Sequence, residues 1–267
     1  MKRLLATVAA VATLTLPAGC GSSGDDNSAG SGSGSGASAS SGGVSGTVTV
    51  FAAASLTESF TTLGKQFEAA HPGTTVKFNF GPSSGLAESI NQGAPADVFA
   101  SASPKNMQQV VDAGGASDSK TFANNVMQIA VPPDNPANVT QVTDLARSGV
   151  KVALCQPQVP CGAVAQEVFK KANITVKPVT QGADVKAVLT TVQLGEVDAG
   201  MVYQTDVQAA GTKVKGIVIP ADQNASTSYP IAALTKAPNE AGAAAFVDYI
   251  LSPDGEKVLS QAGFAAP

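Results

Sequence analysis

The chain has 267 residues, a formal net charge of −4 at pH 7, no tryptophan, three tyrosines and one histidine. An acidic chain without a basic run argues against binding of nucleic acid and against an electrostatic membrane patch. With His71 as its only histidine, the chain also lacks the ligands for an ordinary zinc or copper site, so no cation site is expected.

The first 20 residues have the pattern of a secretory signal peptide. Lys2 and Arg3 precede an apolar run at residues 4–16, which is too short to span a bilayer. The small pair Ala18-Gly19 before Cys20 resembles a bacterial lipoprotein processing site, although Pro17 stands where that pattern usually has leucine. We therefore expect Cys20 to carry a lipid anchor on the outer face of the cell membrane. Ordinary cleavage or a retained helix is the alternative.

Residues 21–46 consist almost entirely of serine, glycine and alanine. Such a segment cannot bury a core, so it is expected to be a flexible tether. Roughly 220 residues remain from Thr47 onward, which is enough for one large or two small α/β domains.

The first part of this body alternates strands with helices. Apolar runs predict strands at 48–51, 75–80 and 97–100, and a helical stripe of Leu56, Phe60, Leu63 and Phe67 separates the first two. Ser55-Leu56-Thr57-Glu58 has the pattern of a capping box at the start of that helix. A second helix is expected to begin at the turn formed by Gly81-Pro82-Ser83-Ser84-Gly85.

The same alternation continues to the end of the chain. Further strands are predicted at 126–131, 150–154, 199–203, 217–219 and 229–234. Further helices are predicted at 162–171, after a cap at Asp184, at 242–251 and at 253–261. The fold class is therefore α/β, with two mainly parallel sheets flanked by helices.

Cys155 and Cys161 are an even pair in an exported protein, which favours a disulfide between them. The alternative is two thiols in a reducing compartment.

One pattern suggests an enzyme. Residues 81–85 fit the Gly-x-Ser-x-Gly nucleophile elbow, with Ser83 as the nucleophile, between a strand and a helix. The hydrolase order requires a histidine after that serine, and none follows His71. Without a general base for Ser83, a secreted serine hydrolase is only a remote alternative, and no enzyme activity is expected.

A second pattern suggests an anion site. Helices begin near Ser55, Ser83, Gly162 and Val185, in each case directly after a loop free of lysine and arginine. The first turn of a helix presents unpaired N–H groups and the positive end of the helix dipole. These helix starts predict an oxyanion site made of neutral donors.

Six strings of residues resemble the periplasmic molybdate-binding proteins that serve ABC transporters. They occur in the order of that family and lie in residues 51–59, 83–86, 93–102, 159–162, 184–189 and 200–206, and the likeness extends over nearly all of 47–267. The resemblance implies a two-lobed periplasmic binding protein fold with a ligand cleft between the lobes.

The resemblance also implies a ligand set. Ser55 and Ser83 would supply hydroxyl and backbone donors from the first lobe. Cys161 and Val185 would supply backbone N–H groups from the second lobe, and Tyr203 its phenol. Molybdate has acceptor oxygens and no proton at neutral pH, so donors alone can satisfy it. Tungstate is nearly isosteric and should bind as well, whereas sulfate or another tetrahedral oxyanion is the alternative ligand.

The implied protein is an extracytoplasmic receptor, expected to be a monomer without a cofactor, that delivers its anion to an ABC permease. The lobes are expected to comprise residues 47–125 with 228–267, and residues 126–227. The chain would cross between them near 123–126 and 226–229, and hinge closure about such crossings would trap the anion.

Overall fold

Strands and helices alternate along the chain in the computed structural model, which describes residues 44–267. The predicted signal peptide, Cys20 and nearly all of the predicted tether lie outside the described residues. The strands are β1 (Gly46–Ala53), β2 (Thr74–Gly81), β3 (Val98–Ala100), β4 (Lys120–Val131), β5 (Val152–Cys155), β6 (Thr180–Gly182), β7 (Ala199–Tyr203), β8 (Lys215–Val218) and β9 (Ser226–Ala233). The helices are α1 (Thr57–Ala70), α2 (Ser83–Asn91), α3 (Pro104–Asp112), α4 (Pro160–Lys171), α5 (Val185–Gln193), α6 (Gln204–Ala210), α7 (Glu240–Ile250) and α8 (Pro253–Gln261), with 3₁₀ turns η1 (Ala54–Leu56), η2 (Val142–Ala146) and η3 (Gly211–Lys213).

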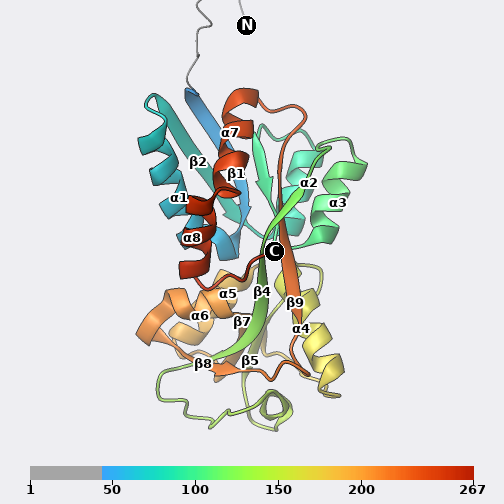
Figure 1. Cartoon of the computed structure of the whole chain (residues 1–267). Coiled ribbons are helices and arrows are strands. Elements are labelled where there is room, and N and C mark those ends of the chain that lie inside the picture. Colours follow the sequence, from blue (N-terminus) through green and yellow to red (C-terminus); the bar gives the residue numbers. More distant parts are fainter. Residues whose placement is uncertain (1–43) are drawn as a thin grey trace, which may run out of the picture. The chain divides into compact units, whose positions relative to one another are not determined.

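The strands pair in the order β2-β1-β3-β9-β4-β7-β5-β6, and β8 pairs with β4. Parallel ladders join β1 to β2 and β3, and join β5 to β6 and β7. Every antiparallel ladder involves β4 or β9, which run side by side through the middle of Figure 1. The predicted α/β fold is confirmed, with parallel strands in its two outer parts and an antiparallel pair between them.

The central pair β4 and β9 connects the two outer parts. Its register sets Ala123 opposite Tyr229 and Val126 opposite Ser226. Strand β4 begins at Lys120, whereas the sequence predicts a strand only from residue 126. The additional residues include the polar pair Asn124-Asn125, and they are extended because β9, about a hundred residues away in sequence, supplies their hydrogen-bond partners.

Buried apolar side chains form three clusters. One is built from residues 127–225 and packs around β5 and β7; we call it the β5 core. The other two are built from residues 48–123 and 229–264 and pack around β1 and β3; we call them the β1 cores. Movement of these parts as two lobes stays a prediction.

Three short elements escape the sequence interpretation: α3, α6 and β6. For α3 the signals are present, because the Ser103 hydroxyl accepts the N–H of Asn106 and Pro104 occupies the first turn. Within the part of the chain that the structure describes, no helix has both the length and the apolar character needed to cross a membrane.

The buried carboxylate of Asp97, which is 1% exposed, joins β1 to the start of α7. One of its oxygens accepts the Thr49 N–H from β1 at 2.7 Å, and the other accepts the Asn239 N–H at the start of α7 at 2.6 Å. Both acceptors are therefore in use.

Replacing Asp97 with asparagine should destabilise the fold, because one of the two backbone N–H groups would then face an amide NH₂. The expected loss in the free energy of unfolding is about 1–3 kcal/mol, measured by denaturant titration. Asp112→Asn is the matched control, since that exposed carboxylate bonds only the Gln108 side chain. Equal unfolding free energies for the two variants would contradict this role of Asp97.

Candidate functional site

A small cavity of about 20 Å³ lies where strands end and helices begin. It is lined by Ala53, Ala54, Ser55, Gly81, Pro82, Ser83, Ala102, Val159, Pro160, Cys161, Asp184, Val185 and Tyr203. All five residues of the implied ligand set, Ser55, Ser83, Cys161, Val185 and Tyr203, are therefore brought to one place. They come from segments that follow β1, β2, β5 and β6, and from the last residue of β7.

The starts of α2, α4 and α5 and the turn η1 line this cavity. No side chain caps η1, α1, α2 or α4. The predicted cap at Asp184 is confirmed, and it takes the Ala187 N–H at 2.9 Å rather than that of Val185. First-turn N–H groups have no partner within their own helix, so these positions need an acceptor from elsewhere.

The predicted capping box at Ser55 and Glu58 is wrong. The 3₁₀ turn η1 precedes α1, so the helix begins at Thr57 and Ser55 is not its cap. The Ser55 hydroxyl bonds Tyr229 instead, and the Glu58 carboxylate bonds Lys186.

Each of the two serine hydroxyls has a hydrogen-bond partner within the protein. Ser83 Oγ accepts the Ala102 N–H at 2.9 Å, and Ser55 Oγ lies 2.8 Å from the Tyr229 hydroxyl. Because a backbone N–H can only donate, the Ser83 hydroxyl keeps its own proton for another acceptor. The cavity that Ser83 lines is where such an acceptor can lie.

The Tyr203 hydroxyl is buried and has no hydrogen-bond partner among residues 44–267. The residue is 1% exposed, and burial raises its pKa well above the usual value, so the phenol keeps its proton. A buried hydroxyl without a partner costs about 1–3 kcal/mol. A ligand oxygen in the cavity would relieve that cost.

The lining of the cavity holds no lysine or arginine. Its one charged residue is Asp184, whose carboxylate serves as the α5 cap. Lys186 follows Val185 directly but turns away, with its ammonium group 2.7 Å from Glu58 and 3.0 Å from Asp206. The cavity therefore offers neutral hydrogen-bond donors, as the helix starts predict.

Cys155 and Cys161 are joined by a disulfide at the start of α4. The loop between them is tightly packed, since a Cβ on Gly162 would lie 2.0 Å from the Gln156 carbonyl oxygen. This packing and the disulfide together fix the position of the Cys161 N–H.

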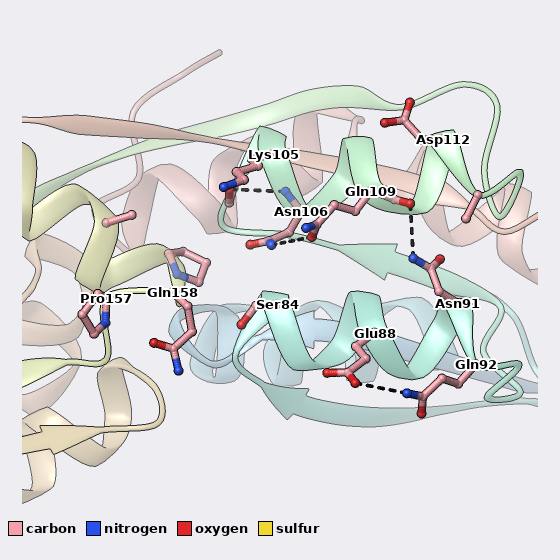
Figure 2. A pocket seen from close by; sticks show the side chains of 14 residues that line it. Ser84, Glu88, Asn91, Gln92, Lys105, Asn106, Gln109, Asp112, Pro157 and Gln158 are labelled. Atoms are coloured by element: carbon pink, nitrogen blue, oxygen red, sulfur yellow. Dashed lines mark hydrogen bonds between the residues drawn. The ribbon is translucent and has the colours of Figure 1, made fainter.

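A larger groove of about 980 Å³ lies next to the cavity, between α2, α3 and the start of α4. Figure 2 shows that several of its polar side chains are hydrogen-bonded: Asn106 donates to the Gln109 side chain, Gln92 donates to Glu88, and Asn91 donates to the Gln109 backbone carbonyl. Ser84 lines this groove, whereas its neighbour Ser83 lines the cavity. Because these polar groups already have partners, the groove is a weaker candidate than the cavity with its unpartnered phenol.

The surroundings of Ser83 do not support hydrolysis. His71 lies at the end of α1, packs against Phe67 with tilted rings whose centroids are 4.4 Å apart, and does not line the cavity. In residues 44–267 no group of three or more histidine, cysteine, aspartate or glutamate side chains could hold a metal ion.

Tyr229, Asn125 and Ala102 were not found from the sequence. They contact the serine hydroxyls or each other through long-range bonds, and no local pattern in a single sequence marks them.

An α/β chain whose strand ends and helix starts enclose a small cavity of donors has the build of a small-ligand-binding protein. The family model of the bacterial extracellular solute-binding proteins matches residues 48–265, and the chain belongs to this family. The family consists of binding proteins, so the prediction that the chain is not an enzyme is confirmed. The family description also agrees with the predicted extracytoplasmic location.

Two curated relatives are molybdate-binding proteins. The chain is 40% identical over 222 residues to the molybdate-binding protein ModA of Mycobacterium tuberculosis, which covers 83% of this chain and 85% of the relative. It is 33% identical over 235 residues to ModA of Escherichia coli, covering 82% and 89%. Among solved structures, the periplasmic molybdate-binding protein of Azotobacter vinelandii has the same fold, with a TM-score of 0.74 at 21% identity, covering 82% and 99%. The resemblance stated from the sequence and the periplasmic binding protein fold are thereby confirmed.

Asp206 lies in the first turn of α6, three residues after Tyr203, and is fully buried. Its carboxylate accepts the Tyr203 N–H at 3.1 Å and pairs with Lys186. Burial raises the pKa of Asp206 from 3.8 to about 6, against the opposing effects of Lys186 and the Tyr203 N–H.

The raised pKa of Asp206 predicts a pH-dependent stability. Between pH 3.8 and about pH 6, the folded state binds more protons at Asp206 than the unfolded state does. The free energy of unfolding should therefore rise as the pH falls through this window. The expected contribution is about 1.4 kcal/mol between about pH 7.5 and about pH 5. Denaturant titrations of the parent and of Asp206→Asn across this range measure it. The same pH slope in both proteins would contradict the prediction.

Proposed function

We propose that this protein is an extracytoplasmic receptor that binds molybdate, and tungstate with it, in the cavity between the β1 and β5 cores. The observation that carries the proposal is the buried Tyr203 hydroxyl, which has no partner among the described residues and lines a cavity of helix starts. The similarity to two ModA proteins supports molybdate as the anion.

The donors match the chemistry of the anion. Molybdate presents four oxygens that accept hydrogen bonds and no proton that would need an acceptor, so hydroxyl and N–H groups alone can satisfy it. In the proposed complex the hydroxyls of Ser55, Ser83 and Tyr203 donate side-chain bonds. The N–H groups of Cys161 and Val185, at the starts of α4 and α5, donate backbone bonds and add the favourable end of the helix dipole.

The anion would also hold the two parts of the protein together. Ser55 and Ser83 belong to segments that pack with the β1 cores, whereas Cys161, Val185 and Tyr203 belong to the β5 core. An anion bonded to both groups of residues would favour the closed arrangement of two lobes, and a permease could recognise that arrangement. The proposed lobes are residues 47–125 with 228–267, and residues 126–227.

Delivery and anchoring complete the proposal. A lipid on Cys20 would hold the protein at the outer face of the membrane, the Ser/Gly-rich segment would act as its tether, and an ABC permease would receive the anion. The receptor acts as a monomer and needs no cofactor.

Binding of the anion should stabilise the full-length protein against heat. Mass action predicts a gain of about 2.7 kcal/mol at a hundredfold excess of ligand over the dissociation constant. The measurement is the unfolding midpoint, in detergent, with molybdate, tungstate, sulfate and phosphate added in turn. Shifts with molybdate and tungstate are expected. A shift with sulfate and none with the other two would refute the assignment and indicate a sulfate receptor.

Removing a single ligand hydroxyl should weaken molybdate binding. Ser83→Ala and Tyr203→Phe each leave one oxygen of a buried dianion without a donor, a loss of roughly 1.5–3 kcal/mol, or about ten- to a hundredfold in affinity. Calorimetric titration of each variant measures the loss, and the unfolding midpoint of the ligand-free protein controls for damage to the fold.

Ser84→Ala is the matched control, because this neighbouring hydroxyl lines the larger groove and not the cavity. It should bind molybdate like the parent. If Ser84→Ala loses affinity while Ser83→Ala and Tyr203→Phe keep it, the proposed ligand set is misplaced.

A further inference from the structure

The Ser55 hydroxyl is the one ligand hydroxyl of the proposed set whose oxygen is bonded by another side chain. Its partner is the Tyr229 hydroxyl, 2.8 Å away, and the Asn125 amide nitrogen lies 3.4 Å from the oxygen of that hydroxyl. The three residues are 5%, 0% and 2% exposed, respectively, so bulk water does not compete for these bonds. Neither Tyr229 nor Asn125 lines the cavity.

The donors and acceptors among Asn125, Tyr229 and Ser55 can be assigned by starting from Asn125. The Val126 N–H donates to Asn125 Oδ1 at 3.0 Å, which fixes the amide oxygen on that side. The amide nitrogen therefore points the other way, where it donates to Thr205 Oγ1 at 2.8 Å and, over a longer distance, to the Tyr229 oxygen. An amide nitrogen can only donate, so the Tyr229 oxygen acts as an acceptor here.

The Tyr229 proton is then available to Ser55. Burial raises the pKa of Tyr229, so the phenol stays protonated. Among residues 44–267 this hydroxyl bonds only Asn125, which donates to it, and Ser55, so we assign the Tyr229 proton to the bond with Ser55 Oγ, which accepts it. The Ser55 hydroxyl then keeps its own proton for another acceptor, and such an acceptor can lie in the cavity that Ser55 lines.

We propose that Tyr229 is a positioning and specificity-determining residue: it fixes the Ser55 hydroxyl as a donor and so weakens the binding of oxyanions that carry a proton. The inference rests on the proposed function and deepens it. Ser83 is held as a donor by the Ala102 N–H in the same way, but through the backbone. A protonated anion such as phosphate needs an acceptor, and with both serine oxygens already in use it finds none in the two hydroxyls.

The main test is a double-mutant cycle with molybdate, using the full-length protein. Tyr229→Phe removes only the hydroxyl, and the ring still packs edge-on against Phe122, Tyr203 and Phe264. Without the Tyr229 donor, the Ser55 hydroxyl can turn. Molybdate affinity is expected to fall about three- to tenfold. In a Ser55→Ala background the same substitution should change affinity by less than about 1.5-fold, because Tyr229 acts through Ser55.

The second test measures the selectivity for molybdate over phosphate, which a purely structural role of Tyr229 would leave unchanged. At about pH 8 inorganic phosphate is a dianion that still carries one proton, so its charge equals that of molybdate. A Ser55 hydroxyl that can turn can accept this proton. Phosphate should therefore compete with molybdate at least about threefold more effectively in Tyr229→Phe than in the parent. An unchanged ratio of the two affinities, or no competition by phosphate in either protein, overturns the selectivity claim.

Tyr249→Phe is the matched control. It also loses one phenol hydroxyl, which bonds the exposed Gln66 side chain at 3.1 Å. No hydrogen bond of the described residues joins Tyr249 or Gln66 to Ser55 or Ser83. This variant should match the parent in both affinities. Should Tyr229→Phe fail to fold, Asn125→Ala replaces it, since it removes the donor that makes the Tyr229 oxygen an acceptor. The same non-additivity with Ser55→Ala is expected.

The outcomes separate the two proposals. If the parent does not bind molybdate, or Ser55→Ala binds it like the parent, the proposed ligand set fails. If Ser55→Ala loses affinity but Tyr229→Phe does not, or loses the same factor in both backgrounds, the positioning role of Tyr229 is overturned while the proposed function stands.

Discussion

Buried hydrogen-bond donors that need an acceptor are the constraint on which this site depends. The starts of α2, α4 and α5 and the turn η1 meet at one small cavity, and the Tyr203 hydroxyl joins them there without a partner in the described chain. Leaving such donors unpaired is costly, and no carboxylate or carbonyl of the lining is aimed at Tyr203 within bonding distance. A ligand made of acceptors resolves the conflict. Because the lining holds no lysine or arginine, a dianion would bind there through many directed bonds rather than through one opposite charge.

The antiparallel pair β4–β9 links this site to the connection between the two outer parts of the fold (Figure 1). Thr227 on β9 donates to the Ala102 carbonyl at 2.7 Å, and the Ala102 N–H in turn holds Ser83. Tyr229, also on β9, holds Ser55. Both serine hydroxyls are thus oriented, directly or through Ala102, by residues of β9. An anion bonded to these serines acts on the same segment about which the proposed lobes would turn.

Local patterns account for much of the fold but not for the contacts that orient the ligands. The stripe of Leu56, Phe60, Leu63 and Phe67 predicts α1, and the four residues are fully buried. The Asp184 cap is likewise readable from the sequence. The five cavity-lining residues of the implied ligand set were identified from the family resemblance rather than from a local pattern. The bond of Ser55 to Tyr229 spans 174 positions, and only the tertiary fold creates it. The capping box failed because the turn η1 precedes α1, and the Glu58 carboxylate instead bonds Lys186, 128 positions away.

The most direct test of the central claim is the position of the anion itself. Crystals of the protein grown with molybdate should show an anomalous scattering peak from molybdenum inside the cavity, within hydrogen-bonding distance, about 2.7–3.2 Å, between an anion oxygen and the Tyr203 hydroxyl. The same anion should contact the Ser83 hydroxyl and the N–H groups of Cys161 and Val185. A peak in the groove beside Ser84, or a cavity that stays without molybdenum at saturating concentrations, would contradict the account.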